Sequence, residues 1–391
     1  MATMGNDRKA ASVPPFKKKI KVLFVLRMIG FGGAERQVVE LCSGMNKDRF
    51  DITVALFFHD DGFLEQLNAS GVKVRILSTK SQYKSSVIFQ LIRLMKEEQF
   101  DILQTMLPIA NLAGGIAARF STRPQVVGSL RNTNPFSWLD PFCLMDLVAL
   151  NLFSDRVVVN SQAGKQSALK KYGLRNDKVT VIYNGKDFSP YVNKSAGIDR
   201  LRKELHIPGD HKVVTTIGRI AKQKGHRYLV EAAHILVRQK NQKMTFLLAG
   251  KAEESFAEIQ SLIKEYSLES NVRLLGLRND IADILHLSDV FVLPSLWEGL
   301  PNVLLEAMIA KVPVVATDIE PHREVIEHHK TGLLVPPQDS AVLADAIMEI
   351  INNPQKAYLR QEAAYRHVSE KFSREQLVKE YEEFYQNLCR R

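Results

Sequence analysis

Short apolar runs rich in Val, Ile and Leu alternate with longer amphipathic segments along most of the chain. Runs of this length and composition are typical of buried strands, whereas the longer segments have the apolar spacing of helices. Such alternation predicts a parallel sheet with helices on both faces. In the first half of the chain we expect strands at residues 21–26, 52–58, 72–77, 102–105, 126–130, 156–160 and 179–182, with helical patterns at 86–98, 111–120 and 162–172.

The same pattern begins again in the second half. Strands are expected there at residues 213–218, 244–249, 272–275, 289–293, 312–316 and 332–335. A chain of 391 residues also exceeds what one hydrophobic core usually serves. The predicted fold class is therefore α/β, with two doubly wound Rossmann-like units in tandem. We assign a disordered leader to residues 1–19, an N-terminal domain to 20–190, a polar linker to 191–199, a C-terminal domain to 200–371 and a last, charged and aromatic helix to 372–391.

One stretch of the second half combines a strand, a tight loop and a helix start. The expected strand at 289–293 is followed by the sequence P-S-L-W-E-G-L-P-N-V-L-L-E, which ends at Glu306. Gly299 lets the backbone come close to a ligand, and Pro301 suits the first position of a helix, where its missing N–H is no loss. In open parallel sheets, ligands bind at the carboxyl ends of the strands, so this loop is a candidate binding site.

This stretch offers two kinds of ligand contact. The carboxylates of Glu298 and Glu306 can accept hydrogen bonds from hydroxyls. The free amides between them, especially those of Asn302 and Val303, suit a phosphate group at the start of a helix. The combination indicates a ligand that carries both a diphosphate and sugars.

A second loop supplies positive charge. After the strand 213–218, the sequence G-R-I-A-K-Q-K-G places Arg219 and Lys224 on a loop between Gly218 and Gly225. An arginine offers a planar fork to two oxygens and a lysine offers a point charge. Fixed cations of this kind can stabilise a diphosphate leaving group as the bond to it breaks.

The first strand of the chain also leads into a glycine-rich loop. Gly30, Gly32 and Gly33 lie where the strand 21–26 gives way to a helix, a place suited to close approach by phosphate or sugar. The loop is not a dinucleotide fingerprint, because the last position of G-x-G-x-x-G should be small and is Glu35 here.

The sequence E-G-L-P-N-V-L-L-E resembles the donor-site signature of the family 4 retaining glycosyltransferases of GT-B architecture, in which two glutamates have this spacing. The resemblance covers nearly the whole chain after residue 19. It implies two Rossmann-like domains facing a central cleft, with the last helix crossing back to the first domain. It assigns Glu298 to the hydroxyls of the transferred sugar, Glu306 to the ribose hydroxyls, and Arg219 and Lys224 to the diphosphate.

Together with the loops above, the resemblance defines a candidate donor site. Arg278, in L-G-L-R, falls where the family loop meets the base. We find no D-x-D pair that would hold a cation between diphosphate oxygens, so we expect no metal and no cofactor. The catalytic candidates are Glu298, Arg219 and Lys224, and the donor-binding candidates are Gly32, Gly33, Arg131, Gly218, Arg278, Gly299, Leu300, Asn302, Val303 and Glu306.

The first domain departs from the family pattern at two places. Where many members have H-x-H after a strand, this chain has Gln104, Thr105 and Met106. Where many members have a histidine that touches the donor sugar, it has Arg131. A retaining mechanism in which the leaving phosphate takes the acceptor's proton needs no such histidine, and Arg131 could then bind phosphate or acceptor. These departures leave the identity of the donor sugar open.

Charge is unevenly distributed along the chain. Residues 1–195 contain 27 Lys and Arg against 16 Asp and Glu, and the remaining residues contain 26 against 27, so balances of +11 and −1 give the net charge of +10. A basic first half favours an anionic partner. We expect an anionic membrane surface or a phosphorylated acceptor rather than nucleic acid. Clusters such as Lys165, Lys170, Lys171 and Arg175 are candidates for this contact.

Two further features bear on location. Cys42, Cys143 and Cys389 show no metal-ligand spacing and indicate reduced thiols of a cytosolic protein. The most apolar segment, 135–153, carries Asp140 and Asp146, so we expect a core helix rather than a membrane anchor. The predicted location is cytoplasmic, with peripheral attachment to the cytoplasmic face of a membrane.

The resulting hypothesis is a retaining glycosyltransferase that uses a nucleotide sugar, expected to be a UDP-sugar, to extend a glycan or a lipid-linked acceptor. Two alternatives remain open on the sequence. A nucleotide-sugar epimerase of the same architecture would need acidic and histidine groups that the first domain does not offer. A non-catalytic protein that binds nucleotide sugars or glycans would not need the intact set of Arg219, Lys224, Glu298 and Glu306.

Overall fold

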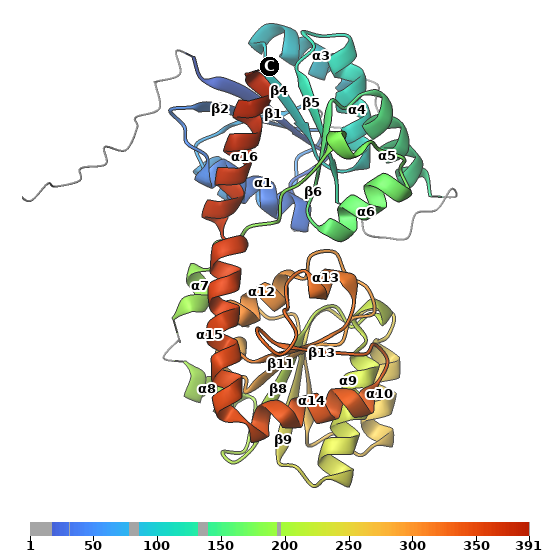
Figure 1. Ribbon diagram of the computed structural model, residues 1–391, viewed down its shortest axis with the longest axis vertical. Helices are drawn as coiled ribbons and strands as arrows, with labels where there is room; N and C mark the ends of the chain where they lie inside the picture. The colour runs from blue at the N-terminus through green and yellow to red at the C-terminus, as the bar shows by residue number, and fades with distance from the viewer. Residues whose placement is uncertain (1–17, 31, 78–85, 132–139, 194–196, 391) are drawn as a thin grey trace, which may run out of the picture.

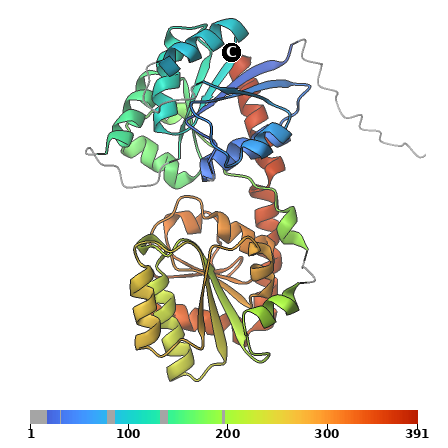
Figure 2. The ribbon, with the colours of Figure 1, turned by 180° about the vertical axis from the view of Figure 1, so that it is seen from behind.

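The computed structural model describes residues 18–30, 32–77, 86–131, 140–193 and 197–390. These residues form two α/β domains stacked along the long axis of the molecule (Figure 1). Each domain is built around one parallel sheet, and the C-terminal segment runs along both (Figures 1 and 2). The predicted fold class, two doubly wound Rossmann-like units, is confirmed. The expected leader lies almost wholly outside the described residues.

The N-terminal sheet has seven parallel strands in the order β3-β2-β1-β4-β5-β6-β7. Alternate residues of β1 (Ile20–Leu26) enter two different cores, because successive side chains of a strand point to opposite faces. Helices therefore cover both faces. The other strands are β2 (Phe50–Leu56), β3 (Lys73–Ile76), β4 (Ile102–Thr105), β5 (Gln125–Leu130), β6 (Arg156–Val159) and β7 (Val179–Val181). The helices are α1 (Gly33–Gly44), α2 (Leu64–Ala69), α3 (Ser86–Glu98), α4 (Pro108–Arg119), α5 (Pro141–Leu152) and α6 (Gln162–Lys170).

The C-terminal sheet has six parallel strands in the order β10-β9-β8-β11-β12-β13. The chain reverses direction across the sheet between β8 and β11, which is where open α/β sheets place their ligands. The strands are β8 (Lys212–Ile217), β9 (Met244–Ala249), β10 (Val272–Gly276), β11 (Val290–Leu293), β12 (Val314–Thr317) and β13 (Leu333–Val335). The helices are α9 (His226–His234), α10 (Phe256–Glu265), α11 (Ile281–Leu287), α12 (Asn302–Ile309), α13 (Glu320–Arg323), α14 (Ser340–Asn352) and α15 (Pro354–Lys371).

The chain passes between the domains twice. The first crossing follows β7 and continues into α7 (Ser189–Val192) and α8 (Ile198–Glu204), so both ends of the stretch expected to be a polar linker lie in short helices. The second crossing joins α15 to α16 (Arg374–Cys389). Helix α16 packs on α1 of the N-terminal domain and buries Tyr381 and Tyr385 fully. The hydroxyl of Tyr385 donates a 3.0 Å hydrogen bond to Oε1 of Gln104, which anchors α16 to the sheet.

The two domains also touch at the loop side of both sheets. Helices α1 and α6 of the N-terminal domain lie toward α12 and α13 of the C-terminal domain (Figure 1). The carboxylate of Glu324, at the end of α13, accepts 2.7 and 2.8 Å hydrogen bonds from the backbone amides of Gln162 and Ala163. A carboxylate at this place complements the positive end of α6. The contact holds the loop edges of the two sheets opposite each other.

Helix α5 corrects one expectation. Residues 135–139 of the segment expected to form a core helix, 135–153, lie outside the described residues. Helix α5 buries only one face, through Cys143, Asp146, Ala149 and Leu150. The opposite face exposes Leu144, Val148 and Leu152, and Phe142 is exposed at the start of the helix. The reason is that α5 is the outer layer over the sheet and packs beside α4, and no described part of the chain packs on its other face. No helix in the described parts of the chain is long and apolar enough to cross a membrane.

Candidate functional site

The loop at residues 294–301, between β11 and α12, carries the first acidic candidate. The Glu298 residue is 8% exposed. Its Oε1 accepts hydrogen bonds from the hydroxyl of Ser295 (2.7 Å) and from Nζ of Lys224 (2.5 Å). Helix α12 begins at Asn302 with Pro301 as its cap residue, one position later than expected. The amides of Asn302 and Val303 thus belong to the first turn, where a helix has no carbonyl acceptors for its N–H groups.

A second loop, residues 218–225 between β8 and α9, is joined to the first by backbone contacts. The amide of Leu296 donates to the carbonyl of Gln223 (2.8 Å), and the side-chain amide of Gln223 donates to the carbonyl of Trp297 (2.9 Å). Gly225 has a left-handed backbone with φ of +62°, and a Cβ there would lie 2.0 Å from the carbonyl oxygen of Pro294. Only glycine fits this approach, which brings Lys224 of the second loop to Glu298 of the first.

The two predicted phosphate-binding cations lie on this second loop. The aliphatic chain of Lys224 passes Gly218, where a Cβ would come within 3.3 Å of it. Nη1 of Arg219 donates to Glu253 (2.6 Å), and its Nη2 donates to Gln223 (3.1 Å). Both cations are therefore held by carboxylates, Lys224 by Glu298 and Arg219 by Glu253. An anionic ligand group at these loops would compete with the two carboxylates for the same donors.

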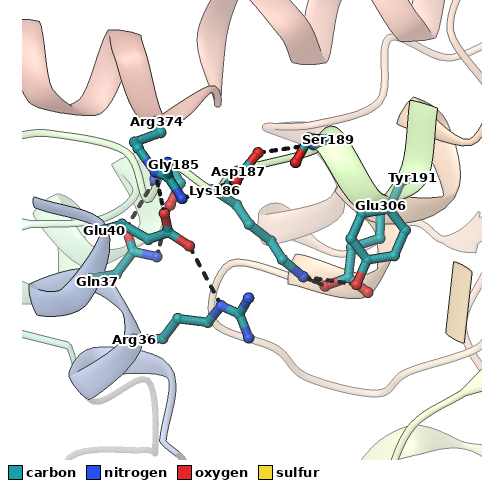
Figure 3. Close-up of polar contacts among 10 residues, drawn as sticks. All are labelled: Arg36, Gln37, Glu40, Gly185, Lys186, Asp187, Ser189, Tyr191, Glu306 and Arg374. Atoms are coloured by element: carbon teal, nitrogen blue, oxygen red, sulfur yellow. Dashed lines mark hydrogen bonds and ion pairs between the residues drawn. The ribbon is translucent and has the colours of Figure 1, made fainter. Parts of the chain in front are cut away.

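The second acidic candidate, Glu306, lies in α12 and is 9% exposed. Its Oε1 is paired with Nζ of Lys186, which lies on the first crossing between the domains (Figure 3). The same ammonium group donates to the hydroxyl of Tyr191 (3.0 Å) and lies 4.6 Å from the centre of the Tyr191 ring. Burial, followed by the charge of Glu306, raises the pKa of the Tyr191 hydroxyl.

Two predicted donor contacts are engaged elsewhere. Arg278 pairs with both oxygens of Asp280, at 2.8 and 2.5 Å, and the hydrogen bonds to this carboxylate raise the pKa of Arg278. Arg131, at the end of β5, donates to Oδ1 of Asn184 (2.7 Å) and to the hydroxyl of Tyr381 (2.9 Å). The guanidinium of Arg131 thus ties the sheet to α16, and its contact with phosphate, acceptor or donor sugar stays a prediction.

The glycines and apolar residues of the predicted site have different surroundings. Gly32 is the cap residue of α1, and a Cβ there would lie 2.1 Å from Oε2 of Glu35. Gly33 begins α1 and faces open space. Gly299 is half-buried in its loop, and Leu300 is buried in the core beneath α12. Only the backbone of Leu300 can therefore contact a ligand.

Residues at the ends of neighbouring strands support Glu298 and were not predicted. The hydroxyl of Thr317, the last residue of β12, donates to the carbonyl of Ser295 at 2.5 Å. His322 in α13 is fully buried, and its Nδ1 donates to the carbonyl of Thr317 at 2.7 Å. Burial lowers the pKa of His322 to about 4 and keeps the ring neutral. The rule that ligands bind at the carboxyl ends of parallel strands was the available signal for Thr317 and for Glu253, which follows β9.

Comparison with known families identifies both halves of the chain. Residues 197–367 match the model described as "Glycosyl transferases group 1", and residues 31–189 match "Glycosyltransferase Family 4". The UDP-Gal:alpha-D-GlcNAc-diphosphoundecaprenol alpha-1,3-galactosyltransferase of Escherichia coli is 27% identical over 358 residues, which cover 86% of this chain and 89% of that protein. The N-acetyl-alpha-D-glucosaminyl L-malate synthase of Bacillus anthracis is 26% identical and covers 79% of this chain, with 80% of its own length aligned.

Solved structures share the whole architecture. Anabaena Alr3699/HepE in complex with UDP superimposes with a TM-score of 0.82 at 26% identity, covering 94% of this chain and 100% of that one. WaaG, a glycosyltransferase involved in lipopolysaccharide biosynthesis, superimposes with a TM-score of 0.71 at 14% identity, which shows the fold alone. Two Rossmann-like domains with their loop edges opposed define the GT-B class. The chain belongs to the family 4 glycosyltransferases of this architecture, as its glutamate spacing predicted.

Neutral burial of His322 predicts acid sensitivity of the fold. Because its folded pKa of about 4 lies below the ordinary value of 6.5, the unfolded chain takes up the proton first. The free energy of unfolding is therefore fully retained above about pH 6.5 and falls toward pH 4, by up to roughly 1.4 kcal/mol per pH unit for this group. In His322→Asn, which keeps a donor near Thr317 but does not titrate, urea unfolding between pH 4 and 6.5 should show a smaller pH slope. The control is His59→Asn, at an exposed position. An unchanged slope in His322→Asn would contradict the neutral burial of His322.

Proposed function

We propose that the protein is a retaining glycosyltransferase that moves a sugar from a UDP-sugar to a glycan or lipid-linked acceptor. The observation that carries this proposal is the junction of two loops at one sheet edge, where Lys224 meets Glu298 beside the free amides of α12. Such a junction offers positive charge and N–H groups to a diphosphate and a carboxylate to sugar hydroxyls. The fold and family support transferase chemistry at this place.

In the proposed mechanism, the diphosphate leaves the anomeric carbon as its negative charge grows. Arg219, Lys224 and the amides of Asn302 and Val303 stabilise that charge, so no metal ion is required. The ammonium of Lys224 bridges a phosphate oxygen and Glu298, which fixes the carboxylate against the sugar. Glu306 holds the ribose, which does not react.

Retention of the anomeric configuration follows if the acceptor attacks from the face that the diphosphate leaves. The leaving phosphate oxygen then takes the proton of the acceptor hydroxyl, and the new glycosidic bond forms as the old bond breaks. The position of the family histidine supports a mechanism without a base from the N-terminal domain. At that position this chain has Arg131, whose guanidinium already donates hydrogen bonds to Asn184 and Tyr381.

The choice of UDP rests on relatives and neighbours. The Escherichia coli relative is named for UDP-Gal, and the Anabaena neighbour was solved with UDP and with UDP-glucose. The same relative is named for an acceptor attached to diphosphoundecaprenol, a lipid carrier. A lipid-linked acceptor would place the enzyme at a membrane surface.

One face of the N-terminal domain suits such a surface. The exposed apolar side chains of α5 lie beside the cationic end of α6, because the side-chain amide of Asn151 in α5 donates to the carbonyl of Tyr172 just after α6 (3.0 Å). Lys170, Lys171 and Arg175 are exposed there. Apolar side chains flanked by cations are typical of helices that lie in a membrane interface. We therefore propose that α5 and α6 attach the enzyme to anionic lipid.

The substrate class is tested with a panel of nucleotide sugars, by measuring sugar transfer and donor hydrolysis alongside thermal unfolding. A UDP-sugar should raise the melting temperature and be consumed equally with and without EDTA, since a ligand that binds only the native state stabilises it. Consumption of the donor separates a transferase from a non-catalytic binding protein, and release of an epimerised nucleotide sugar would reveal an epimerase. Binding that is lost in EDTA and restored by magnesium or manganese would refute the metal-free mechanism.

The two glutamates should give different kinetic defects. Glu298→Gln should lower kcat by at least about a hundredfold, the scale of one lost transition-state contact. Glu306→Gln should chiefly raise the donor KM, because uniform binding of an unreactive group is lost. The control is Glu265→Gln, at an exposed position of α10, which should keep the wild-type kcat and KM. A normal kcat in correctly folded Glu298→Gln would show that the sugar does not bind at this loop.

Attachment to lipid should depend on charge and on the apolar face together. The wild type should sediment with vesicles that contain anionic lipid and much less with neutral vesicles, and salt should weaken binding because each cation near the surface contributes about 1 kcal/mol. Lys170→Glu combined with Lys171→Glu should abolish sedimentation, as should Val148→Glu. The matched control reverses Lys264 and Lys356, two exposed lysines of the C-terminal domain. Equal sedimentation of wild type and variants would refute this surface.

A further inference from the structure

The two crossings between the domains are paired with each other at Lys186. The amide of Lys186 donates to the carbonyl of Phe372 (3.1 Å), and the amide of Arg374 donates to the carbonyl of Lys186 (3.1 Å). This forms a short parallel bridge between Lys186 and Ser373. A Cβ at Gly185 would lie 2.4 Å from the carbonyl oxygen of Ser373, so the two strands of chain are in close contact. The backbone of Lys186 is thereby fixed at the point where both crossings meet.

The same point is fastened to the N-terminal domain (Figure 3). The side-chain amide of Gln37 in α1 both donates to the carbonyl and accepts from the amide of Gly185, each at 3.0 Å. Arg374 binds Glu40 of α1 at 2.5 Å and lies 3.1 Å from Asp187. The backbone at Lys186 is therefore fastened to α1, while Phe188 of the same segment packs in the core beneath α12.

The side chain of Lys186 points the other way, into the C-terminal domain (Figure 3). It ends at Glu306, and the two side chains are only 10% and 11% exposed. A buried ion pair of this kind usually adds little net stability, because removing two charges from water costs about as much as their attraction returns. The pair is therefore better explained by what the ammonium group does for Glu306.

We propose that Lys186 is a positioning residue for the donor ribose. Its ammonium group compensates the charge of Glu306 and fixes the rotamer of the carboxylate, so that Oε2 and the remaining lone pair of Oε1 accept from the ribose hydroxyls. Tyr191 in turn directs the ammonium group by accepting its hydrogen bond. This proposal rests on the assignment of Glu306 to the ribose made above.

Lys186 connects the two domains at the proposed ribose site. Because Lys186 is fastened to α1 and the carboxylate belongs to α12, recognition of the ribose depends on the relative position of the N-terminal and C-terminal domains. A nucleotide bound at Glu306 would favour the domain arrangement in which Lys186 reaches Glu306. The size of this effect is the difference in nucleotide affinity between the arrangements.

The test compares the affinity for UDP with that for 2′,3′-dideoxy-UDP by calorimetry. Wild type should prefer UDP by at least about tenfold, the scale of hydrogen bonds to a charged group. Lys186→Met keeps the apolar stem and should reduce this preference as far as Glu306→Gln does, with donor KM raised and kcat little changed. The double variant should show no further loss, because the two residues act as one unit.

A second lysine that lies beside a glutamate and a tyrosine supplies the control. Lys311 pairs with Glu362 at 2.6 Å and lies 4.9 Å from the centre of the Tyr365 ring, so it has the same types of neighbour as Lys186 at a more exposed place away from the candidate site. Lys311→Met should keep the wild-type preference for UDP. Loss of ribose preference should appear only in Lys186→Met.

Each outcome decides between the two proposals. A folded Lys186→Met that keeps the wild-type preference while Glu306→Gln loses it would overturn the role of Lys186 and leave the ribose assignment intact. Equal binding of the two nucleotides by wild type would overturn the ribose assignment itself, and the role of Lys186 with it. If Lys186→Met does not fold, Tyr191→Phe should lower the preference by a smaller factor, and an unchanged preference in that variant would overturn the proposal.

Discussion

The candidate site depends on one close contact between two loops of the C-terminal sheet. Gly225 allows the loop after β8 to approach the carbonyl of Pro294 in the loop after β11, and no residue with a Cβ could stand there. A backbone hydrogen bond from Leu296 to Gln223 and a side-chain hydrogen bond from Gln223 to the carbonyl of Trp297 then fix the pair of loops. The ion pair between Lys224 and Glu298 follows from this approach. The structure therefore brings a cation and a carboxylate together before any ligand is bound, which limits the reorganisation that a donor requires.

A second layer of neutral groups supports this pair. Ser295, Thr317 and His322 form a chain of hydrogen bonds behind Glu298, and His322 is held neutral by burial. A protonated ring at this place would add a buried positive charge close to Lys224 and oppose its interaction with anionic groups. The chain of neutral donors orients the carboxylate without changing the charge of the site.

The N-terminal domain contributes contacts to the last helix that the sequence did not predict. Arg131 and Gln104 stand at the positions where the family pattern has histidines, and both contact α16, through Tyr381 and Tyr385. Their polar groups thus anchor the helix that crosses from the C-terminal domain. Near the same crossing, Lys186 extends from a segment fastened to α1 and reaches Glu306. The donor-side chemistry of one domain is in this way connected to the backbone of the other.

Much of the fold was determined by local sequence pattern. Apolar runs and amphipathic segments identified the strands and several of the helices, because burial of one side or both sides of an element leaves a period in the chain itself. The spacing of Glu298 and Glu306 and the cations of the loop after β8 were also evident, since each motif lies within one short segment. The first residue of a helix differed from the prediction where the preceding loop decides it. Pro301, for example, caps α12 instead of starting it.

Tertiary structure decided which charges meet. Lys224 and Glu298 are 74 positions apart, and Lys186 and Glu306 are 120 apart, so no local pattern could pair them. It also decided that α5 buries only one of its apolar faces and that Arg131 turns toward α16. The sequence by itself determined the elements, the fold class and the chemical groups of the site, because these depend on neighbours along the chain. The partner of each charged group depends on how distant loops pack, and only the folded arrangement of the two sheets establishes it.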